Sequence, residues 1–366
     1  MTSSVLSKPT TAARSDRQVR RRRRFPIRAG QVAVWELAVA GTVLAGAHTT
    51  TPGMVIGGVG LLAVVATAVP RRGRWLYQWL TLGVRYRVRR RAQRRAGPAG
   101  DPLDTVLPGV RFHTYADRAG NRTGLAGDGH SWTAVLRIGN TEDVDPADLI
   151  GPLEAAYRRT DLPAAAVQLV SWTVPVPDGD PVRMCWLAVR FSPAACPAAV
   201  AARGGGEGGA LRATANAALA LARDLSEAGI PAAPLDGAEL RSQLTVALGA
   251  TEDVAATVAE SWRTFSVGTV RQACYRPRSN LTPAGVLAVT APSAAAFVAT
   301  SLTLSRPGTG TAPADPEMHL VVRTGAPAAQ SKYGPDDAAD ALGIPLYRLD
   351  GEQAKQVRAT LPLALG

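Results

Sequence analysis

Two apolar runs, separated by five residues, stand near the start of the chain at residues 32–47 and 53–69. Arginines precede the first run and follow the second, whereas the connection between them holds no formally charged side chain at neutral pH. Basic flanks are retained on the cytoplasmic side of a membrane. The pattern predicts a transmembrane hairpin, with helices over about residues 31–50 and 53–69 and both ends of the chain cytoplasmic.

The predicted spans are short, which favours contact with other membrane helices. A straight span takes about 20 residues, and about 17 at the least. The Glu36 carboxylate, near the start of the first span, can reach either the cytoplasmic membrane–water interface or a polar side chain of another membrane helix. Small residues let helix backbones approach closely. We predict a membrane assembly face made of Glu36, Gly41, Ala45, Gly53 and Gly57.

The arginine-rich flanks predict contact with anionic lipid headgroups. Residues 1–100 hold 19 basic and two acidic side chains, a net charge of +17, whereas residues 101–366 hold 22 and 27, a net charge of −5. Basic residues beside a membrane attract anionic headgroups at about 1 kcal/mol each. The acidic remainder speaks against nucleic acid as a partner. The residues assigned to headgroup contact and topology are Arg20, Arg21, Arg22, Arg23, Arg24, Arg28, Arg71, Arg72, Arg74, Trp75 and Trp79.

A cleaved signal peptide is the alternative for the first apolar run. A basic stretch, an apolar run and Ala45-Gly46-Ala47 match its pattern. The second run would still anchor the protein after such cleavage. We therefore expect a disordered basic leader over 1–30, the hairpin over 31–70, a basic juxtamembrane helix or linker over 71–100, and a cytosolic mixed α/β domain over 101–366.

Beyond residue 100, strand-like and helix-like patterns alternate. Asp128-Gly129 between apolar runs predicts a hairpin turn. Asp236 and Glu239 have the spacing of a capping box. The expected strands cover 110–115, 123–126, 132–138, 166–174, 184–191, 262–267, 270–275, 297–305, 319–324 and 346–349. The expected helices cover 146–159, 210–228, 236–249, 252–260, 336–342 and 352–361.

Residues with catalytic or metal-binding chemistry are scattered along the chain. Four histidines have no metal-ligand spacing, and three cysteines form no CxxC pair, which fits a reducing compartment. Asp143/Asp145 and Asp178/Asp180 match the DxD pattern of metal-dependent glycosyltransferases, although aspartate is also common in turns. The segment 204–209 is glycine-rich but lacks the lysine and hydroxyl residue of a P-loop. A membrane-tethered glycosyltransferase-like enzyme acting on a nucleotide-sugar is the alternative to a non-catalytic protein.

The order of several segments resembles a known family. A basic leader, two short spans and Trp75–Trp79 are followed by the stretch 118–135, by 166–170, and by Cys196-Pro197 ahead of the glycine-rich segment and a long alanine-rich helix. Over roughly residues 25–305 the chain is similar to EccE, a membrane core component of actinobacterial type VII (ESX) secretion systems. The resemblance implies a non-catalytic structural subunit without a cofactor. The partners that it implies are EccB, EccC, EccD and a mycosin protease.

Overall fold

The computed structural model describes residues 70–71, 74–96, 100–250, 257–278, 280–306, 315–328 and 333–365, together with seven isolated positions before residue 65. The chain divides into two compact units, Met1–Leu82 and Gly83–Gly366. The predicted leader and most of both predicted spans lie outside the described residues. Within the described part, no helix has both the length and the apolarity to cross a membrane.

In the first unit, β1 (Pro70–Arg71) pairs with β2 (Arg74–Trp75) in an antiparallel ladder. Helix α3 (Leu76–Ala96) follows directly, and the division between the two units falls within it. The backbone N–H of Trp75 donates to the Gln78 side chain at 3.1 Å, which satisfies one of the open donors at the start of the helix. The predicted juxtamembrane segment is therefore helical over the residues that α3 covers.

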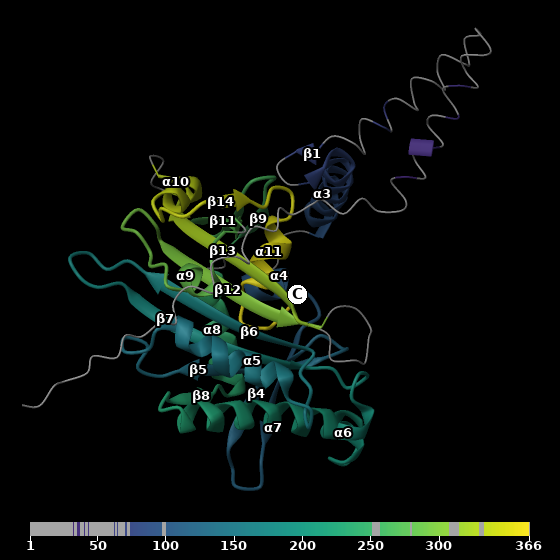
Figure 1. The fold of residues 1–366 in the computed structure, drawn as a ribbon, viewed down its shortest axis with the longest axis vertical. Coiled ribbons are helices and arrows are strands. Elements are labelled where there is room, and N and C mark those ends of the chain that lie inside the picture. Colours follow the sequence, from purple (N-terminus) through teal and green to yellow (C-terminus); the bar gives the residue numbers. More distant parts are fainter. Residues whose placement is uncertain are drawn as a thin grey trace, which may run out of the picture. The chain divides into compact units, whose positions relative to one another are not determined.

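A 12-stranded antiparallel sheet forms the centre of the second unit (Figure 1). Its main path runs β3-β4-β5-β7-β6-β12-β13-β11-β10-β9, and β8 and β14 pair with β5 and β11. The strands are β3 (Arg111–Ala116), β4 (Arg122–Gly127), β5 (Trp132–Ile138), β6 (Ala166–Val174), β7 (Val182–Phe191), β8 (Ala232–Pro234), β9 (Val258–Glu260), β10 (Phe265–Val267), β11 (Val270–Pro277), β12 (Phe297–Ser305), β13 (Glu317–Pro327) and β14 (Leu346–Arg348).

The turn between β4 and β5 confirms the hairpin predicted at Asp128-Gly129. The Asp128 carboxylate accepts hydrogen bonds from the backbone N–H groups of His130 and Ser131, at 3.1 and 2.9 Å. Gly129 has φ +87°, a conformation that costs glycine little. Arg190 of β7 donates to the same carboxylate, so the turn is also tied to the neighbouring strand.

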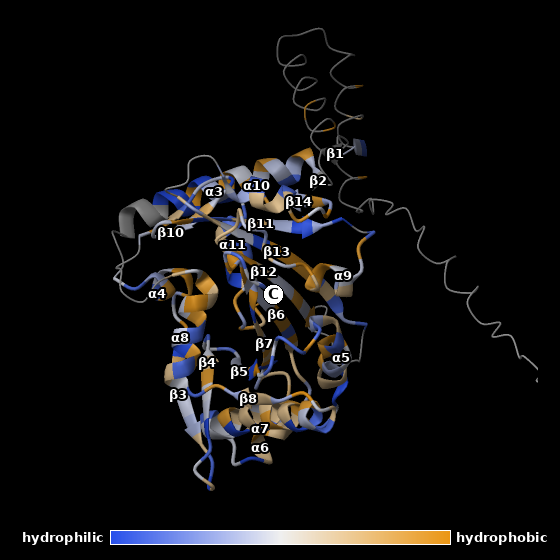
Figure 2. Cartoon of the chain, turned by 90° about the vertical axis from the view of Figure 1, so that its left-hand side faces the viewer, coloured by the Kyte–Doolittle hydropathy of each residue, from blue (hydrophilic) through white to orange (hydrophobic). Residues whose placement is uncertain are grey.

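Alternating side chains of the central strands point into two separate cores, because successive residues of a strand face opposite sides of the sheet. On one face, Leu136 and Leu187 pack in the core that also includes Leu221 of α7 (Gly206–Glu227). On the other face, Trp186 packs in the core that includes Leu244 of α8 (Gly237–Leu248). Figure 2 shows the apolar residues, in orange, that run along α5 and α7. The remaining helices are α4 (Pro102–Val106), η1 (Pro146–Leu149), α5 (Ile150–Arg158), α6 (Pro197–Ala201), α9 (Pro283–Leu287), α10 (Pro335–Asp340) and α11 (Gln353–Ala359).

The residues after α11 are buried in the second core. The Gln168 amide of β6 accepts from the Ala364 backbone N–H at 2.6 Å and donates to the Ala359 carbonyl at 2.7 Å. The Thr133 hydroxyl of β5 donates to the Leu363 carbonyl at 3.0 Å. A buried polar group is costly unless it is hydrogen-bonded. Gln168 and Thr133 are therefore core residues that hold this segment against the sheet.

One predicted helix is wrong, and others have different ends. Residues 258–260, expected within a helix over 252–260, form β9 and pair with β10, while residues 251–256 lie outside the described part. Pairing with a neighbouring strand outweighs a weak local helix pattern here. Helix α7 begins at Gly206, ahead of the predicted start at residue 210. The short helices α4, α6 and α9, each with proline in its first turn, have too few residues to show a helical period.

Candidate functional site

Most of the residues predicted for membrane assembly and lipid contact lie outside the described part. Glu36 is described as helical and exposed. Arg71 and Arg74 are partners in the β1–β2 ladder. Trp75 of β2 and Trp79 in the first turn of α3 are half-buried. The roles of these residues remain predictions. The residues outside the described part are Arg20, Arg21, Arg22, Arg23, Arg24, Arg28, Gly41, Ala45, Gly53, Gly57 and Arg72.

Within the second unit, α3 is anchored to the sheet domain by Arg89. Its guanidinium donates to the Gly351 carbonyl at 2.6 Å and lies 3.5 Å from the Glu260 carboxylate. The Glu260 side chain is only 1% exposed and also accepts from the backbone N–H of Ala354 at 3.1 Å. Ala354 lies in the first turn of α11, where a carboxylate is favoured by the helix dipole. Glu260 therefore joins α3, β9 and α11.

An aromatic pair lies beside this anchor. The rings of Tyr86 and Trp262 meet edge to face, with centroids 5.3 Å apart. The Gly351 N–H donates to the Trp262 carbonyl at 2.7 Å, and a Cβ at Gly351 would lie 2.7 Å from the Trp262 ring. Gly351 also has φ +76°. Glycine at this position thus lets the backbone pass directly against the indole.

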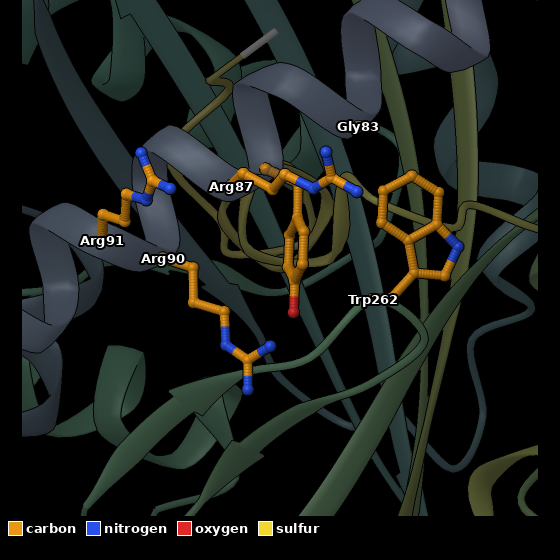
Figure 3. Close-up of a pocket in the computed structure, with 6 residues that line it drawn as sticks. Gly83, Arg87, Arg90, Arg91 and Trp262 are labelled. Atoms are coloured by element: carbon orange, nitrogen blue, oxygen red, sulfur yellow. The ribbon is translucent and has the colours of Figure 1, made fainter.

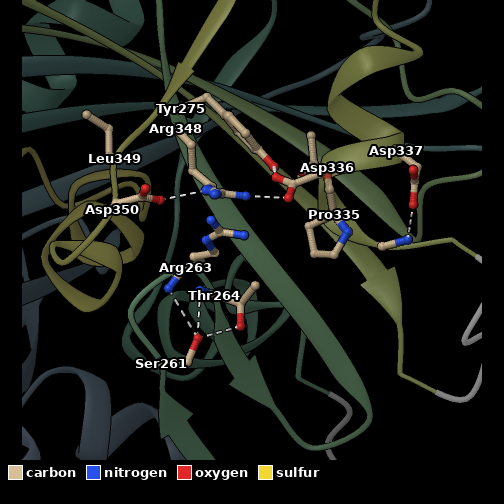
Figure 4. Close-up of polar contacts among 12 residues, drawn as sticks. Ser261, Arg263, Thr264, Tyr275, Pro335, Asp336, Asp337, Arg348, Leu349 and Asp350 are labelled. Carbon is tan, nitrogen blue, oxygen red and sulfur yellow. Dashed lines mark hydrogen bonds and ion pairs between the residues drawn. The ribbon is translucent and has the colours of Figure 1, made fainter. Parts of the chain in front are cut away.

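Trp262 stands in a turn whose flanking residues Ser261, Arg263 and Thr264 are joined by hydrogen bonds (Figure 4). The Ser261 hydroxyl oxygen accepts from the backbone N–H groups of Arg263 and Thr264, at 3.3 and 2.9 Å, and hydrogen-bonds to the Thr264 hydroxyl at 2.8 Å. Such local hydrogen bonds stabilise turns. The position of the indole is therefore determined by its own turn as well as by Gly351.

Arginines on one face of α3 complete a pocket of about 480 Å³ (Figure 3). Side chains three or four positions apart share a helix face, which brings Arg87, Arg90 and Arg91 to the same side. Figure 3 shows the Arg87 guanidinium directed toward the indole. We name this the arginine–aromatic pocket; it is lined by Gly83, Tyr86, Arg87, Arg90, Arg91 and Trp262. It is the candidate functional site.

In the sequence these arginines belong to one basic juxtamembrane segment, over 71–100, in which their roles are not distinguished. The helical period could have separated Arg89 from Arg87, Arg90 and Arg91, because the two sets point in different directions around α3. Nothing local to α3, however, predicts the proximity of Trp262 or Glu260, which follow more than 160 residues later.

A second, smaller pocket of about 230 Å³ lies beside Arg89 and Glu260 and includes Arg358 of α11. Burial lowers the pKa of the Arg358 guanidinium, and the positive charge of Arg89 adds to this effect, while Glu260 opposes it. The buried Glu260 carboxylate is therefore ion-paired with Arg89 and also lies close enough to Arg358 to favour its positive charge. These charges stabilise the junction between α3 and α11. Three exposed arginines of α3 line the arginine–aromatic pocket and not this smaller one.

A polar cluster joins β11, α10 and β14 (Figure 4). The Tyr275 hydroxyl donates to Asp336 at 2.6 Å, and Arg348 donates to Asp336 and, at 2.6 Å through Nε, to Asp350. Burial raises the pKa of Tyr275, and the hydrogen bond to Asp336 raises it further. The hydroxyl therefore stays protonated and donates throughout the physiological range. The cluster connects structural elements through satisfied hydrogen bonds.

The two acidic pairs lie in separate turns, and all four carboxylates are exposed. Asp145 caps η1 by accepting from the Ala147 N–H at 2.9 Å. Asp178 has φ +58° in the turn between β6 and β7. Across the described ranges, no three or more His, Cys, Asp or Glu side chains gather as a metal site would require. These positions support the interpretation of both pairs as turn residues.

The glycine-rich segment forms the junction between α6 and α7. Gly204 and Gly205 have φ +96° and +71°. A Cβ at Gly209, inside α7, would lie 2.5 Å from the Val200 carbonyl oxygen. The glycines therefore allow two helices to pack closely.

A comparison with protein families gives a match to part of the chain. Residues 181–276 match the family described as "Putative type VII ESX secretion system translocon, EccE". The matched segment runs from β7 to β11 and includes α7, α8 and Trp262. None of the curated proteins matches the chain. Over residues 181–276 the chain is therefore similar to the EccE family, whose description is that of a type VII secretion translocon component.

Proposed function

We propose that the chain is a non-catalytic structural subunit of a type VII secretion complex in the cell membrane. The EccE match over residues 181–276 carries this proposal. The fold is consistent with it, because the buried carboxylate of Glu260 and the half-buried guanidinium of Arg348 connect elements of the domain to one another. A domain held together in this way suits a protein that presents fixed surfaces to partners. The EccE family is usually considered non-catalytic.

The proposed partners are EccB, EccC, EccD and the mycosin protease, with anionic lipids around the membrane part. Affinity purification of the full chain from detergent-solubilised membranes tests this, and we expect these chains to co-purify. A wild-type chain that is recovered alone from intact, secreting cells would contradict the proposal.

We propose further that Glu36, Gly41, Ala45, Gly53 and Gly57 form the assembly face in the membrane. Gly53→Leu with Gly57→Leu should release the chain from its partners and leave it in the membrane fraction, because both changes increase apolarity and obstruct close helix contact.

Val55→Leu with Val59→Leu is the matched control. These positions have the same spacing and fall on the opposite side of a helix. Normal co-purification of the glycine variant would show that the glycines face lipid.

Localisation follows from the hairpin: a multi-pass cell-membrane protein with both termini cytoplasmic. A fluorescent reporter fused after Gly366 should be active, and an alkaline phosphatase fused there should be inactive, because the phosphatase needs an oxidising compartment for its disulfides. Phosphatase activity from the fusion would overturn the hairpin topology. This test is independent of the identity of the partners.

A further inference from the structure

We propose that the arginine–aromatic pocket binds the phosphate of an anionic phospholipid headgroup. The pocket belongs to the second unit and is formed by α3 residues from Gly83 onward together with Trp262. The choice of a lipid as the source of the phosphate rests on the proposed membrane attachment. The affinity for phosphate itself follows from the pocket.

The first observation is charge. The side chains of Arg87, Arg90 and Arg91 are exposed, and no carboxylate of the described residues pairs with them. By contrast, Arg89 is already committed to Gly351 and Glu260. Guanidinium groups bind phosphate through paired, charge-assisted hydrogen bonds. Three exposed guanidiniums on one helix face thus form a binding site for an anion.

The second observation is that the pocket has a fixed wall. The turn at Ser261 and the contact with Gly351 position Trp262, and Trp262 meets Tyr86 edge to face. At Gly83, an added Cβ would meet no atom within 4 Å, so the helix leaves open space there. The ligand therefore enters a preformed site, which reduces the entropy lost on binding.

Size and setting favour a headgroup over a nucleic acid. A volume of about 480 Å³ lies within the range of small-ligand pockets. Helix α3 begins seven residues after the second predicted span. Basic clusters next to membrane spans bind anionic lipids, and tryptophan and tyrosine rings favour the depth of the headgroups. Nucleic-acid binding would require a broad basic surface, whereas residues 101–366 carry a net charge of −5.

The test uses the full chain in a non-ionic detergent. Short-chain phosphatidylglycerol, short-chain phosphatidylcholine and inorganic phosphate are titrated separately, and binding is followed by tryptophan fluorescence. The Trp262→Phe variant identifies the part of the signal that comes from Trp262. We expect saturable binding of phosphatidylglycerol, at least tenfold weaker binding of the zwitterionic lipid, and only weak competition from inorganic phosphate at the same concentration.

Two triple variants distinguish binding in the pocket from non-specific attraction of the lipid by positive charge. Changing Arg87, Arg90 and Arg91 to Gln should weaken phosphatidylglycerol binding about 100-fold. The control changes three exposed arginines of β3, β4 and their turn to Gln, with the same loss of charge, and should weaken binding by about twofold at most; these are Arg111, Arg118 and Arg122.

Replacing the three pocket arginines by lysine gives a further readout. Lysine keeps the charge but lacks the planar fork of the guanidinium. An intermediate loss, about tenfold, would support paired hydrogen bonds to a phosphate. Full retention of binding by the lysine variant would show that charge alone suffices and would overturn the assignment.

Two further outcomes would overturn the proposal. Equal losses in the pocket variant and its control would show that net charge, not the pocket, attracts the lipid. Equal binding of inorganic phosphate, with displacement of the lipid, would assign the site to a soluble phosphate ligand. Co-purification of partners is measured on the same variants and tests the proposed role in secretion. Lipid binding and complex assembly therefore have separate readouts, and either proposal can fail without the other.

Discussion

Arg323 is a fully buried guanidinium with no acidic partner among the described residues. It donates to the Gln272 amide oxygen at 3.0 Å and to the Ala247 carbonyl, and it lies over the Phe297 ring, 5.1 Å from the centroid. Burial lowers its pKa to about 10. Ala247 belongs to the last turn of α8, where the helix dipole favours a positive charge. The fold thus uses Arg323 to close the end of a helix inside the core.

The three cysteines should differ sharply in reactivity. Burial raises the pKa of Cys185 to about 11 and that of Cys274 to about 12, whereas Cys196 is only partly buried and its pKa is raised less. At pH 8 the first two thiols would be thiolate about one part in 1,000 and one part in 10,000 respectively. We expect maleimide to modify Cys196 first in the folded chain, and faster as the pH rises, as measured by mass spectrometry.

The Cys196→Ser variant provides the control for this labelling. It should abolish the fast modification and leave the slow reaction of the two buried thiols, which requires opening of the core. Modification of Cys274 as fast as Cys196 in the folded chain would show that the second core is accessible to reagent.

At the scale of elements, the contact between the β3–β4 hairpin and the start of α8 is close and specific. Asp236 caps α8 by accepting from the N–H groups of Ala238 and Glu239, and the Glu239 carboxylate accepts from the Asp236 N–H at 3.1 Å, which confirms the predicted capping box. The Gly124 N–H donates to the Leu235 carbonyl at 2.6 Å. The backbone before α8 therefore lies directly against β4.

Gly124→Ala should destabilise this contact. A Cβ at Gly124 would lie 2.4 Å from the Asp236 carbonyl oxygen, a backbone atom that cannot rotate away. Overpacking of this kind costs about 1–3 kcal/mol, and each kcal/mol shifts the Tm of a domain of this size by about 2–4 °C. Thermal unfolding of the full chain in detergent measures the effect.

Gly208→Ala is the matched change in the opposite direction. Gly208 lies in the first turn of α7, is exposed, and would meet no atom within 4 Å through an added Cβ. Replacing glycine by alanine where the backbone conformation suits both residues adds about 0.4–1 kcal/mol of stability. A Gly124→Ala variant as stable as the wild type would show that the hairpin can shift away from α8.

At the scale of the whole molecule, the sheet of the second unit carries helices on both faces and so has two apolar cores (Figures 1 and 2). The turns at the ends of its strands hold the two acidic pairs in separate places. An enzyme that holds a metal with a DxD pair would need further groups converging on it. The geometry of these turns instead fits capping and chain reversal.

Replacing each acidic pair by Asn should therefore leave secretion nearly unchanged. Asn is also a good helix cap for position 145, and it tolerates the positive φ of position 178. Surface changes of this kind shift stability by about 0.5 kcal/mol or less. Immunoblots of a secreted substrate in culture supernatant, at matched levels of the chain, measure the outcome. Abolished export from a stably expressed Asp143/Asp145 or Asp178/Asp180 variant would favour the enzyme alternative.

Local patterns in the sequence determined most of the elements of the second unit. The predicted strands 132–138, 166–174 and 297–305 coincide with β5, β6 and β12, and the exposed positions of α7 include the polar stripe Arg212, Asn216 and Arg223. Alternation, capping and turn chemistry depend on residues a few positions apart, so one stretch of chain is enough to express them. The EccE resemblance also came from the order of such segments.

Only the tertiary structure decided which elements meet and what the arginines of α3 do. Residues 166–173 pair with 298–305 across the sheet, and Glu260 and Trp262 lie against α3 from more than 160 residues away. The strand at 258–260 exists because β10 lies beside it. Contacts between residues so far apart in the sequence produce no local periodicity. They form because folding brings apolar surfaces and opposite charges together in space. The helical period separates Arg89 from the pocket arginines, but only the folded chain brings Glu260 to Arg89 and Trp262 to the others.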